Sequence, residues 1–284
     1  MNASGILGSS LGGLMRLRKA GVAALVTKSF TIEKREGYPT PIAIPLPYGM
    51  VNAVGLANPG IEGLKPLVSE AVGLGLPVVV SIAASTPEEA EALAKAAVEA
   101  GAAALEVNLS CPHAEKRGLE VGVDPELSAA IVEAASSAGA PVYAKLGLMD
   151  NLPRRVPPLL DAGAKGVVLI NTLKAMVIDV YAEKPILGHG VGGLSGPAIH
   201  PIAVRAVYEV YGETGAPIIG VGGVTGWKEA AELILAGARA VQVGTGIVLL
   251  GEGVVCSIVS GLASWLKGKG YESISEAVGA AHKR

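Results

Sequence analysis

The stretch Ala104-Leu105-Glu106-Val107-Asn108-Leu109 decides the fold, because its nearly continuous apolar character is typical of a strand buried on both faces of a parallel sheet. It leads directly into Ser110-Cys111-Pro112-His113, which places a hydroxyl, a thiol and an imidazole just past the strand. In parallel α/β proteins the carboxyl ends of the strands carry the chemistry, since side chains there are held rigidly and face open space. We therefore expect a functional site at this rim.

Apolar runs of the same kind recur along the chain, and helical patterns such as Pro87 to Ala100, opened by Thr86, lie between them. This alternation predicts an α/β fold with a single (β/α)8 TIM barrel over residues 1–284; an open Rossmann-type sheet is the competing architecture. Residues 1–5 are the candidate for the remaining strand, which is either very short or begins upstream of Met1. The other runs lie at residues 22–27, 77–82, 142–146, 166–171, 217–221 and 240–244.

Two stretches break this rhythm. Residues 31–62 form a proline-rich excursion, and residues 172–197 form a long glycine-rich connection after the sixth strand of the barrel. Long connections inside compact domains are more often functional than accidental. We therefore expect both excursions to contribute to the site.

Composition excludes several classes of function. The net charge of −2 and the lack of a basic run argue against a nucleic-acid partner. The longest uncharged stretch is interrupted by prolines, so we expect no membrane-spanning helix, and no secretory signal is visible. Cys111 and Cys256 are the two cysteines, too few for a disulfide framework, a zinc site or an iron-sulfur cluster. We expect a cytoplasmic enzyme that binds no metal.

Glycine-rich turns follow the last two predicted barrel strands, at residues 220–226 and 244–246. Glycines there let backbone N–H groups approach an anion closely, so the turns predict a phosphate site rather than tight turns alone. Residues 188–193 also match the Gly-x-Gly-x-x-Gly dinucleotide fingerprint. No helical pattern follows them directly, so we do not interpret them as a dinucleotide site.

Polar residues at the predicted strand ends are the candidates for chemistry. Lys28 and Lys145 are costly on apolar strands unless the ammonium meets an anion, the alternative being that each side chain reaches solvent. Cys111 is a candidate base or nucleophile, and His113 either pairs with the thiol or caps the loop. Residues 114–118 have the polarity of a mobile lid. Three of the six asparagines follow apolar runs, where barrel strands are expected to end: Asn52, Asn108 and Asn171.

Taken in order, these motifs resemble the soluble class of flavin-dependent dihydroorotate dehydrogenases, almost from end to end. Residues 52–60 together with Cys111 are most similar to the NAD-linked branch, whose catalytic subunit works with an electron-transfer subunit. The segments that carry the resemblance are residues 3–5, 27–31, 49–60, 108–112, 144–146, 170–173, 192–197, 222–223 and 244–245.

The resemblance implies oxidation of dihydroorotate to orotate in pyrimidine (UMP) biosynthesis, with Cys111 as the base and FMN as the hydride acceptor. It further implies a homodimer or heterotetramer with a partner subunit that carries FAD and an iron-sulfur cluster and passes electrons to NAD. The implied FMN contacts are Ser4, Lys28, Ser29, Asn108, Lys145, Ile170, Gly196, Gly222, Gly223, Gly244 and Thr245. The implied substrate contacts are Lys28, Asn52, Ala53, Val54, Gly55, Leu56, Asn108, Asn171 and Thr172.

Two residues depart from the family pattern. His113 stands where the family usually has asparagine, a feature shared with dihydropyrimidine dehydrogenases, and Ser81 replaces an asparagine near the flavin. A uracil or thymine reductase on the same scaffold is therefore the main alternative, although residues 171–173 and 184–187 look more like the dihydroorotate branch. Two further alternatives are a Schiff-base lyase that uses Lys145 and a flavin-binding subunit without catalysis.

Overall fold

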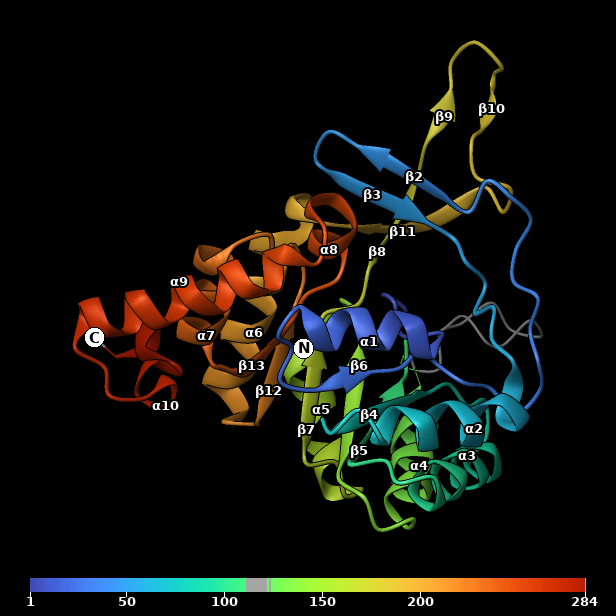
Figure 1. The fold of residues 1–284 in the computed structure, drawn as a ribbon, viewed down its shortest axis with the longest axis horizontal. Helices are drawn as coiled ribbons and strands as arrows, with labels where there is room; N and C mark the ends of the chain where they lie inside the picture. Colours follow the sequence, from blue (N-terminus) through green and yellow to red (C-terminus); the bar gives the residue numbers. More distant parts are fainter. Residues whose placement is uncertain (111–121, 123, 284) are drawn as a thin grey trace.

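A computed structural model describes residues 1–110, 122 and 124–283 of the chain, and its centre is a curled parallel sheet (Figure 1). Every neighbouring pair of strands in this sheet is parallel, in the order β1-β4-β5-β6-β7-β12-β13. All seven predicted apolar runs contribute a strand, which confirms the α/β barrel expected from the sequence. The strands are β1 (Leu25–Val26), β4 (Val78–Ile82), β5 (Ala104–Asn108), β6 (Val142–Leu146), β7 (Gly166–Leu169), β12 (Ile218–Val221) and β13 (Ala238–Gln242).

The N-terminal segment joins the two edges of this sheet. Its backbone pairs with β13 through a parallel bridge between Asn2 and Val243, with Ala3 N donating to Val243 O at 2.9 Å. On the other side the carboxamide of Asn2 accepts from Val26 N at 2.8 Å and donates to Val26 O at 2.7 Å. Beside β1, the Asn2 side chain thus makes the hydrogen bonds that a neighbouring strand backbone would make. The N-terminal strand expected from the sequence is reduced to the single backbone bridge between Asn2 and Val243.

Helices cover the outer face of the sheet (Figure 1). The N-caps follow the sequence: Thr86 accepts from Glu89 N ahead of Pro87, and Asp124 caps the helix that begins at Pro125. Among the described residues no helix is long and apolar enough to cross a membrane. The α-helices are α1 (Leu11–Lys19), α2 (Gly60–Val72), α3 (Pro87–Glu99), α4 (Pro125–Ser136), α5 (Leu152–Asp161), α6 (His200–Thr214), α7 (Trp227–Ala236), α8 (Thr245–Leu250), α9 (Gly253–Lys269) and α10 (Ile274–Ala277), with 3-10 turns η2 (Pro197–Ile199) and η3 (Ala280–His282).

Apolar side chains pack on both faces of the barrel strands. The main cluster contains Ala144 and Leu146 of β6 and lies between sheet and helices. A smaller cluster includes Val168 and Val221, with Tyr143 packed against it. Since strand residues two apart share a face, Tyr143 and Lys145 belong to the inner face of β6. Lys145 therefore projects into the barrel and not toward the helices.

The two excursions pair with each other at the mouth of the barrel. They form a four-stranded antiparallel sheet in the order β2-β3-β11-β8, called here the cap, in which Val51 lies opposite Leu194. A separate hairpin of β9 and β10 projects away from the barrel (Figure 1). The strands are β2 (Ala43–Leu46), β3 (Gly49–Asn52), β8 (Leu173–Met176), β9 (Ile178–Asp179), β10 (Lys184–Pro185) and β11 (Val191–Ser195).

The cap corrects one expectation and bears out another. Asn52 does not end a barrel strand: it is the last residue of β3, because the apolar run before it pairs with β2 and β11. The fingerprint at residues 188–193 runs into strand β11, with no helix directly after it. The dinucleotide motif therefore lacks the strand-turn-helix setting that phosphate binding requires.

Candidate active site

A cavity of about 520 Å³ lies between the carboxyl ends of the barrel strands and the cap. This volume is within the range of cofactor and ligand sites. Cys111, His113 and the predicted lid at residues 114–118 lie outside the described residues. Every other residue that the sequence assigned to cofactor or substrate lines this cavity: Ser4, Lys28, Ser29, Asn52, Ala53, Val54, Gly55, Leu56, Asn108, Lys145, Ile170, Asn171, Thr172, Gly196, Gly222, Gly223, Gly244 and Thr245.

The floor of the cavity holds a buried cation. Lys145 Nζ lies 3.3 Å from Glu106 Oε1 and donates to Gln242 Oε1 at 3.3 Å. Gln242 Nε2 in turn donates to Glu106 Oε2 at 2.6 Å. The sequence predicted an anionic partner for Lys145, and the protein itself supplies one, the carboxylate of Glu106 on the neighbouring strand. The sequence interpretation missed Glu106 and Gln242, although a charge inside an apolar strand and the chain's single glutamine were both visible.

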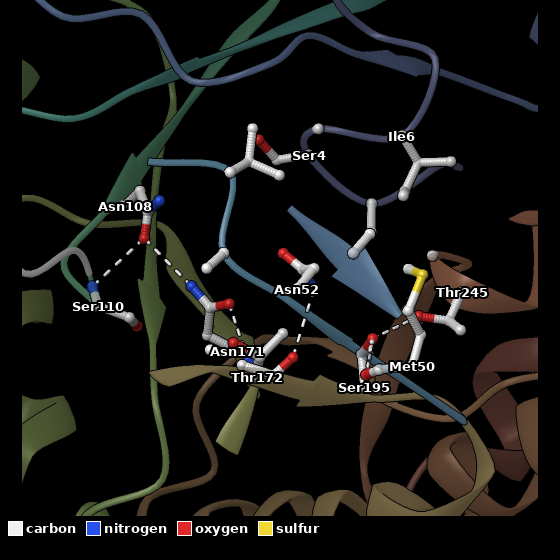
Figure 2. Close-up of a pocket in the computed structure, with 18 of the residues that line it drawn as sticks. Ser4, Ile6, Met50, Asn52, Asn108, Ser110, Asn171, Thr172, Ser195 and Thr245 are labelled. Atoms are coloured by element: carbon white, nitrogen blue, oxygen red, sulfur yellow. Dashed lines mark hydrogen bonds between the residues drawn. The ribbon is translucent and has the colours of Figure 1, made fainter. Parts of the chain in front are cut away.

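Two asparagines meet at the edge of the cavity. Asn108 Oδ1 accepts from Asn171 Nδ2 at 3.3 Å and from Ser110 N at 3.3 Å, and Figure 2 shows the two carboxamides pointing toward each other. Asn171 Oδ1 also accepts from Thr172 N at 2.8 Å. Asn108 ends β5 and Asn171 follows β7, so two barrel strands fix a pair of amide groups in the cavity wall.

Hydroxyl groups extend this network along the barrel rim. Asn108 Nδ2 donates to Ser29 Oγ at 3.4 Å, and Ser29 Oγ lies 2.9 Å from Ser81 Oγ and 3.3 Å from Ser4 Oγ. Ser81 is fully buried, so its hydroxyl serves Ser29 behind the cavity wall. Ser81, where this chain departs from the family pattern, thus supports Ser29 from behind, and Ser29 lines the cavity.

The cap is tied to the barrel by side-chain hydroxyls. Thr245 Oγ1 donates to Ser195 Oγ at 2.7 Å, and Ser195 Oγ donates to Met50 O at 3.3 Å, as Figure 2 shows. Asn52 Nδ2 donates to Gly193 O at 3.4 Å within the cap. The carboxamide of Asn52 is therefore presented to the cavity from the cap side, opposite the amides of the barrel strands.

Two adjacent glycines at the end of β12 cannot be replaced without disturbance. Gly222 has φ +138°, and a Cβ there would lie 2.6 Å from Ala203 Cβ. Gly223 has φ +67°, and its Cβ would lie 2.6 Å from His200 Cβ. The backbone can follow this path beside α6 only with glycine, and it leaves main-chain atoms facing the cavity. Such a turn is suited to an anionic group that approaches the backbone closely.

The rim contains a contact between the two excursions that the sequence interpretation missed. The rings of Tyr38 and His189 stack, with centroids 3.6 Å apart and planes 5° apart, and both line the cavity together with Arg35 and Lys174. Tyr38 belongs to no motif identified in the sequence, and His189 occupies a variable position of the discounted fingerprint at residues 188–193. The two residues lie far apart in the chain. The sequence alone does not indicate this contact, because it depends on the two excursions facing each other in the fold.

The donors and acceptors around the cavity define what it can bind. Amide groups of three asparagines suit a planar ring whose edge alternates carbonyl and N–H groups, because each carboxamide both donates and accepts. Lys28 and Lys145 add cationic groups, and the glycine turns add backbone approach to an anion. Within the described ranges, no group of three or more His, Cys, Asp or Glu side chains could hold a metal ion.

Similarity to known proteins agrees with this geometry. A protein of Aeropyrum pernix, named provisionally as dihydroorotate dehydrogenase A (fumarate), is 50% identical over 99% of this chain and 93% of its own. The dihydroorotate dehydrogenase B (NAD(+)) catalytic subunit of Thermococcus kodakarensis is 45% identical over 94% of this chain and 88% of its own. A crystal structure of DHODH from Eimeria tenella in complex with ferulenol superposes with a TM-score of 0.85 at 20% identity, covering 100% of this chain and 85% of that one.

The match to the family as a whole spans most of the sequence. The model of the family described as dihydroorotate dehydrogenase matches residues 1–266, which include both excursions and every cavity-lining residue. The Eimeria structure, at its low identity, supports the barrel fold. This chain belongs to the dihydroorotate dehydrogenase family.

Proposed function

We propose that this chain oxidises dihydroorotate to orotate in pyrimidine biosynthesis, using FMN as the hydride acceptor and Cys111 as the base. One observation carries the proposal: the residues matched to cofactor and substrate come from distant parts of the sequence and line a single cavity. Family membership supports the same reaction.

The cavity wall fits FMN. The glycine turns at Gly222, Gly223 and Gly244, with Gly196 and Thr245, would hold the phosphate, since backbone atoms there lie open to the cavity. Lys145 would face the electron-rich ring system from the floor, with Ser4, Ser29 and Ile170 beside it. Bound FMN would supply the two-electron redox chemistry of the reaction.

The substrate would bind between the barrel and the cap. Asn108 and Asn171 from the barrel side, and Asn52 from the cap side, would hydrogen-bond the edge of the pyrimidine ring. The remaining contacts are those of Thr172 and residues 53–56, and Lys28 would neutralise negative charge on the ligand. Cys111 would take a proton from one ring carbon as the neighbouring carbon gives up its hydride.

Electron exit requires a partner in this proposal. Relatives from Thermococcus kodakarensis and Pyrococcus abyssi are named dihydroorotate dehydrogenase B (NAD(+)), catalytic subunit, which supports a partner subunit and NAD as the acceptor. We propose that this partner bears FAD and an iron-sulfur cluster. The Aeropyrum relative, named for fumarate, makes direct transfer to fumarate the competing route. Purification from the native source distinguishes them: a co-purifying flavin and iron-sulfur subunit in a cytoplasmic heterotetramer supports the first.

Steady-state assays with an artificial electron acceptor test the substrate. We expect turnover with dihydroorotate and none with dihydrouracil or dihydrothymine. Activity confined to the dihydropyrimidines would contradict the proposal and support the pyrimidine-reductase alternative. The Schiff-base alternative is disfavoured by the carboxylate that pairs with Lys145, and borohydride reduction in the presence of substrate tests it, because a lyase intermediate would be trapped on that lysine.

A further inference from the structure

We infer that Glu106 is a positioning residue of the active site, which acts through Lys145 and holds its ammonium at the floor of the cavity with the help of Gln242. The inference rests on the proposed function, since it concerns the side of the cavity assigned to FMN. Neither Glu106 nor Gln242 is among the cavity-lining residues, so both act from beneath.

The placement of the three side chains follows from strand register. Glu106 lies opposite Tyr143, and Asn108 lies opposite Lys145, on the neighbouring strands β5 and β6. Residues two apart share a face, so Glu106 occupies the inner layer directly below Asn108 and Lys145. Gln242 reaches the same point from β13, which is separated from β6 in the sheet by β7 and β12. The hydrogen bonds therefore span the barrel interior.

Burial makes the geometry of this group specific. Lys145 is 5% exposed, and Glu106 and Gln242 are each 1% exposed. A buried ammonium without a carboxylate is strongly disfavoured, while a buried ion pair adds little stability over apolar residues of similar size. The neighbouring interior cluster at Tyr143, Val168 and Val221 shows that this barrel can fill its inner layers with largely apolar side chains. A carboxylate here is therefore better explained by what it does to Lys145 than by packing.

Gln242 fixes which way the carboxylate points. Its Nε2 donates to Glu106 Oε2 at 2.6 Å, which leaves Oε1 for the ammonium. Its Oε1 accepts from Lys145 at 3.3 Å, so the ammonium is held between two oxygen atoms from opposite sides of the barrel. Lys145 thereby loses the rotamer freedom of a long side chain before any ligand arrives, which is preorganisation of a binding group.

A double-mutant cycle on FMN binding tests the inference. The dissociation constant for FMN, measured by flavin fluorescence without dihydroorotate, is compared in the wild type, E106Q, K145Q and E106Q/K145Q. We expect E106Q to weaken FMN binding about tenfold, a change that lies in the middle of the range of coupling energies between contacting residues. We expect no further loss from E106Q once Lys145 is absent. Equal losses in both backgrounds, or wild-type affinity in E106Q, would overturn the inference.

A charge-swap variant separates positioning from structural support. E106Q/Q242E returns a carboxylate to within reach of Lys145 from the other strand. We expect this variant to recover most of the FMN affinity that E106Q loses and to bring the midpoint potential of the bound flavin back toward the wild-type value. A swap no better than E106Q would contradict the inference. If E106Q does not fold, the swap is compared with K145Q: wild-type affinity in the swap supports the inference, and affinity as weak as that of K145Q contradicts it.

The two proposals fail in different ways. If the wild type binds no FMN, the proposed function and this inference both fall. If the wild type binds FMN and oxidises dihydroorotate but the cycle is additive, the function stands and the role of Glu106 alone is wrong.

Discussion

The barrel floor and the cap contribute to the same cavity by opposite means. At the floor, Lys145, Glu106 and Gln242 are buried on continuous parallel strands and interact with one another. In the cap, the strands are partly exposed, and at the cavity rim beside it Tyr38 and His189 come from two excursions that are distant in sequence. The floor is thus suited to hold a resident group rigidly, and the cap to admit and release a small ligand.

This contrast predicts that variants at the barrel floor, the glycine turns and the proposed base alter FMN binding and the redox step. Variants at the proposed substrate contacts, which include Asn171 at the barrel rim and Asn52 in the cap, alter the apparent affinity for dihydroorotate. The interface between the two regions, where Thr245 and Ser195 are hydrogen-bonded, keeps them in register. The following changes test the division, in order of expected effect.

The largest effect is expected for Cys111→Ser, the proposed base, which follows Ser110 in the sequence. A hydroxyl is a much poorer base than a thiol near neutral pH, so flavin reduction should slow by about a hundredfold or more. Stopped-flow absorbance of the bound flavin measures the rate. Cys256→Ser is the matched control, because Cys256 is exposed on α9. Equal rates in the two variants would remove Cys111 from the mechanism.

The next effect is expected for Gly222→Ala at the end of β12. Its Cβ would collide with Ala203 at 2.6 Å, so we expect a loss of about 1–3 kcal/mol in unfolding free energy and weaker FMN binding. Gly139→Ala is the control, since Gly139 has φ +91° and a Cβ there meets nothing within 4 Å. Denaturant titration and flavin fluorescence measure both quantities. If the two variants behave alike, backbone strain rather than close packing governs this turn.

A smaller, substrate-directed effect is expected for Asn171→Ala. The change removes the proposed ring contact and one donor to Asn108, so the KM for dihydroorotate should rise about tenfold, the cost of one or two hydrogen bonds. Asn52→Ala in the cap should raise the KM less, because Asn52 donates to the backbone of Gly193 and not to another amide of the site. FMN affinity within twofold of the wild type is expected for both. Loss of FMN from either variant would break the proposed division.

The smallest effect is expected for His189→Ala at the cavity rim, next to the cap. Loss of the stack with Tyr38 removes an aromatic contact worth about 0.5–1.5 kcal/mol, so the KM should rise by roughly two- to tenfold at unchanged flavin reduction. His282→Ala is the matched control, since His282 stacks on Tyr208 with centroids 3.8 Å apart and is not among the cavity-lining residues. A KM shift in the control alone would show that the Tyr38 stack does not shape the site.

The barrel could be predicted from the sequence because its strands carry their own signal. The runs around Leu105, Val142 and Val167 are largely apolar and buried, a pattern that few structures besides a covered parallel sheet tolerate. The cap could not be predicted, since Val191–Ser195 contains two glycines and lacks a clear alternation of apolar and polar residues. Its pairing with Gly49–Asn52 depends on the barrel bringing the two excursions together.

The site shows the same division. Lys145 and the asparagines were identified because polar side chains at strand ends are exceptional. Glu106 was missed because it sits in mid-strand, where its function depends on Gln242 from the other side of the barrel. Tyr38 and His189 were missed because no sequence pattern links two loops that meet only in space. Local sequence patterns do not predict contacts across the barrel interior or across its mouth, because these contacts form only in the folded barrel.

The most direct test of the central claim is anaerobic mixing of the FMN-loaded chain with dihydroorotate, without a partner subunit or an added acceptor. We predict that the absorbance of oxidised flavin falls by one equivalent per chain and that orotate appears in equal amount. Flavin that stays oxidised with dihydroorotate, yet is bleached by dithionite, would contradict the account.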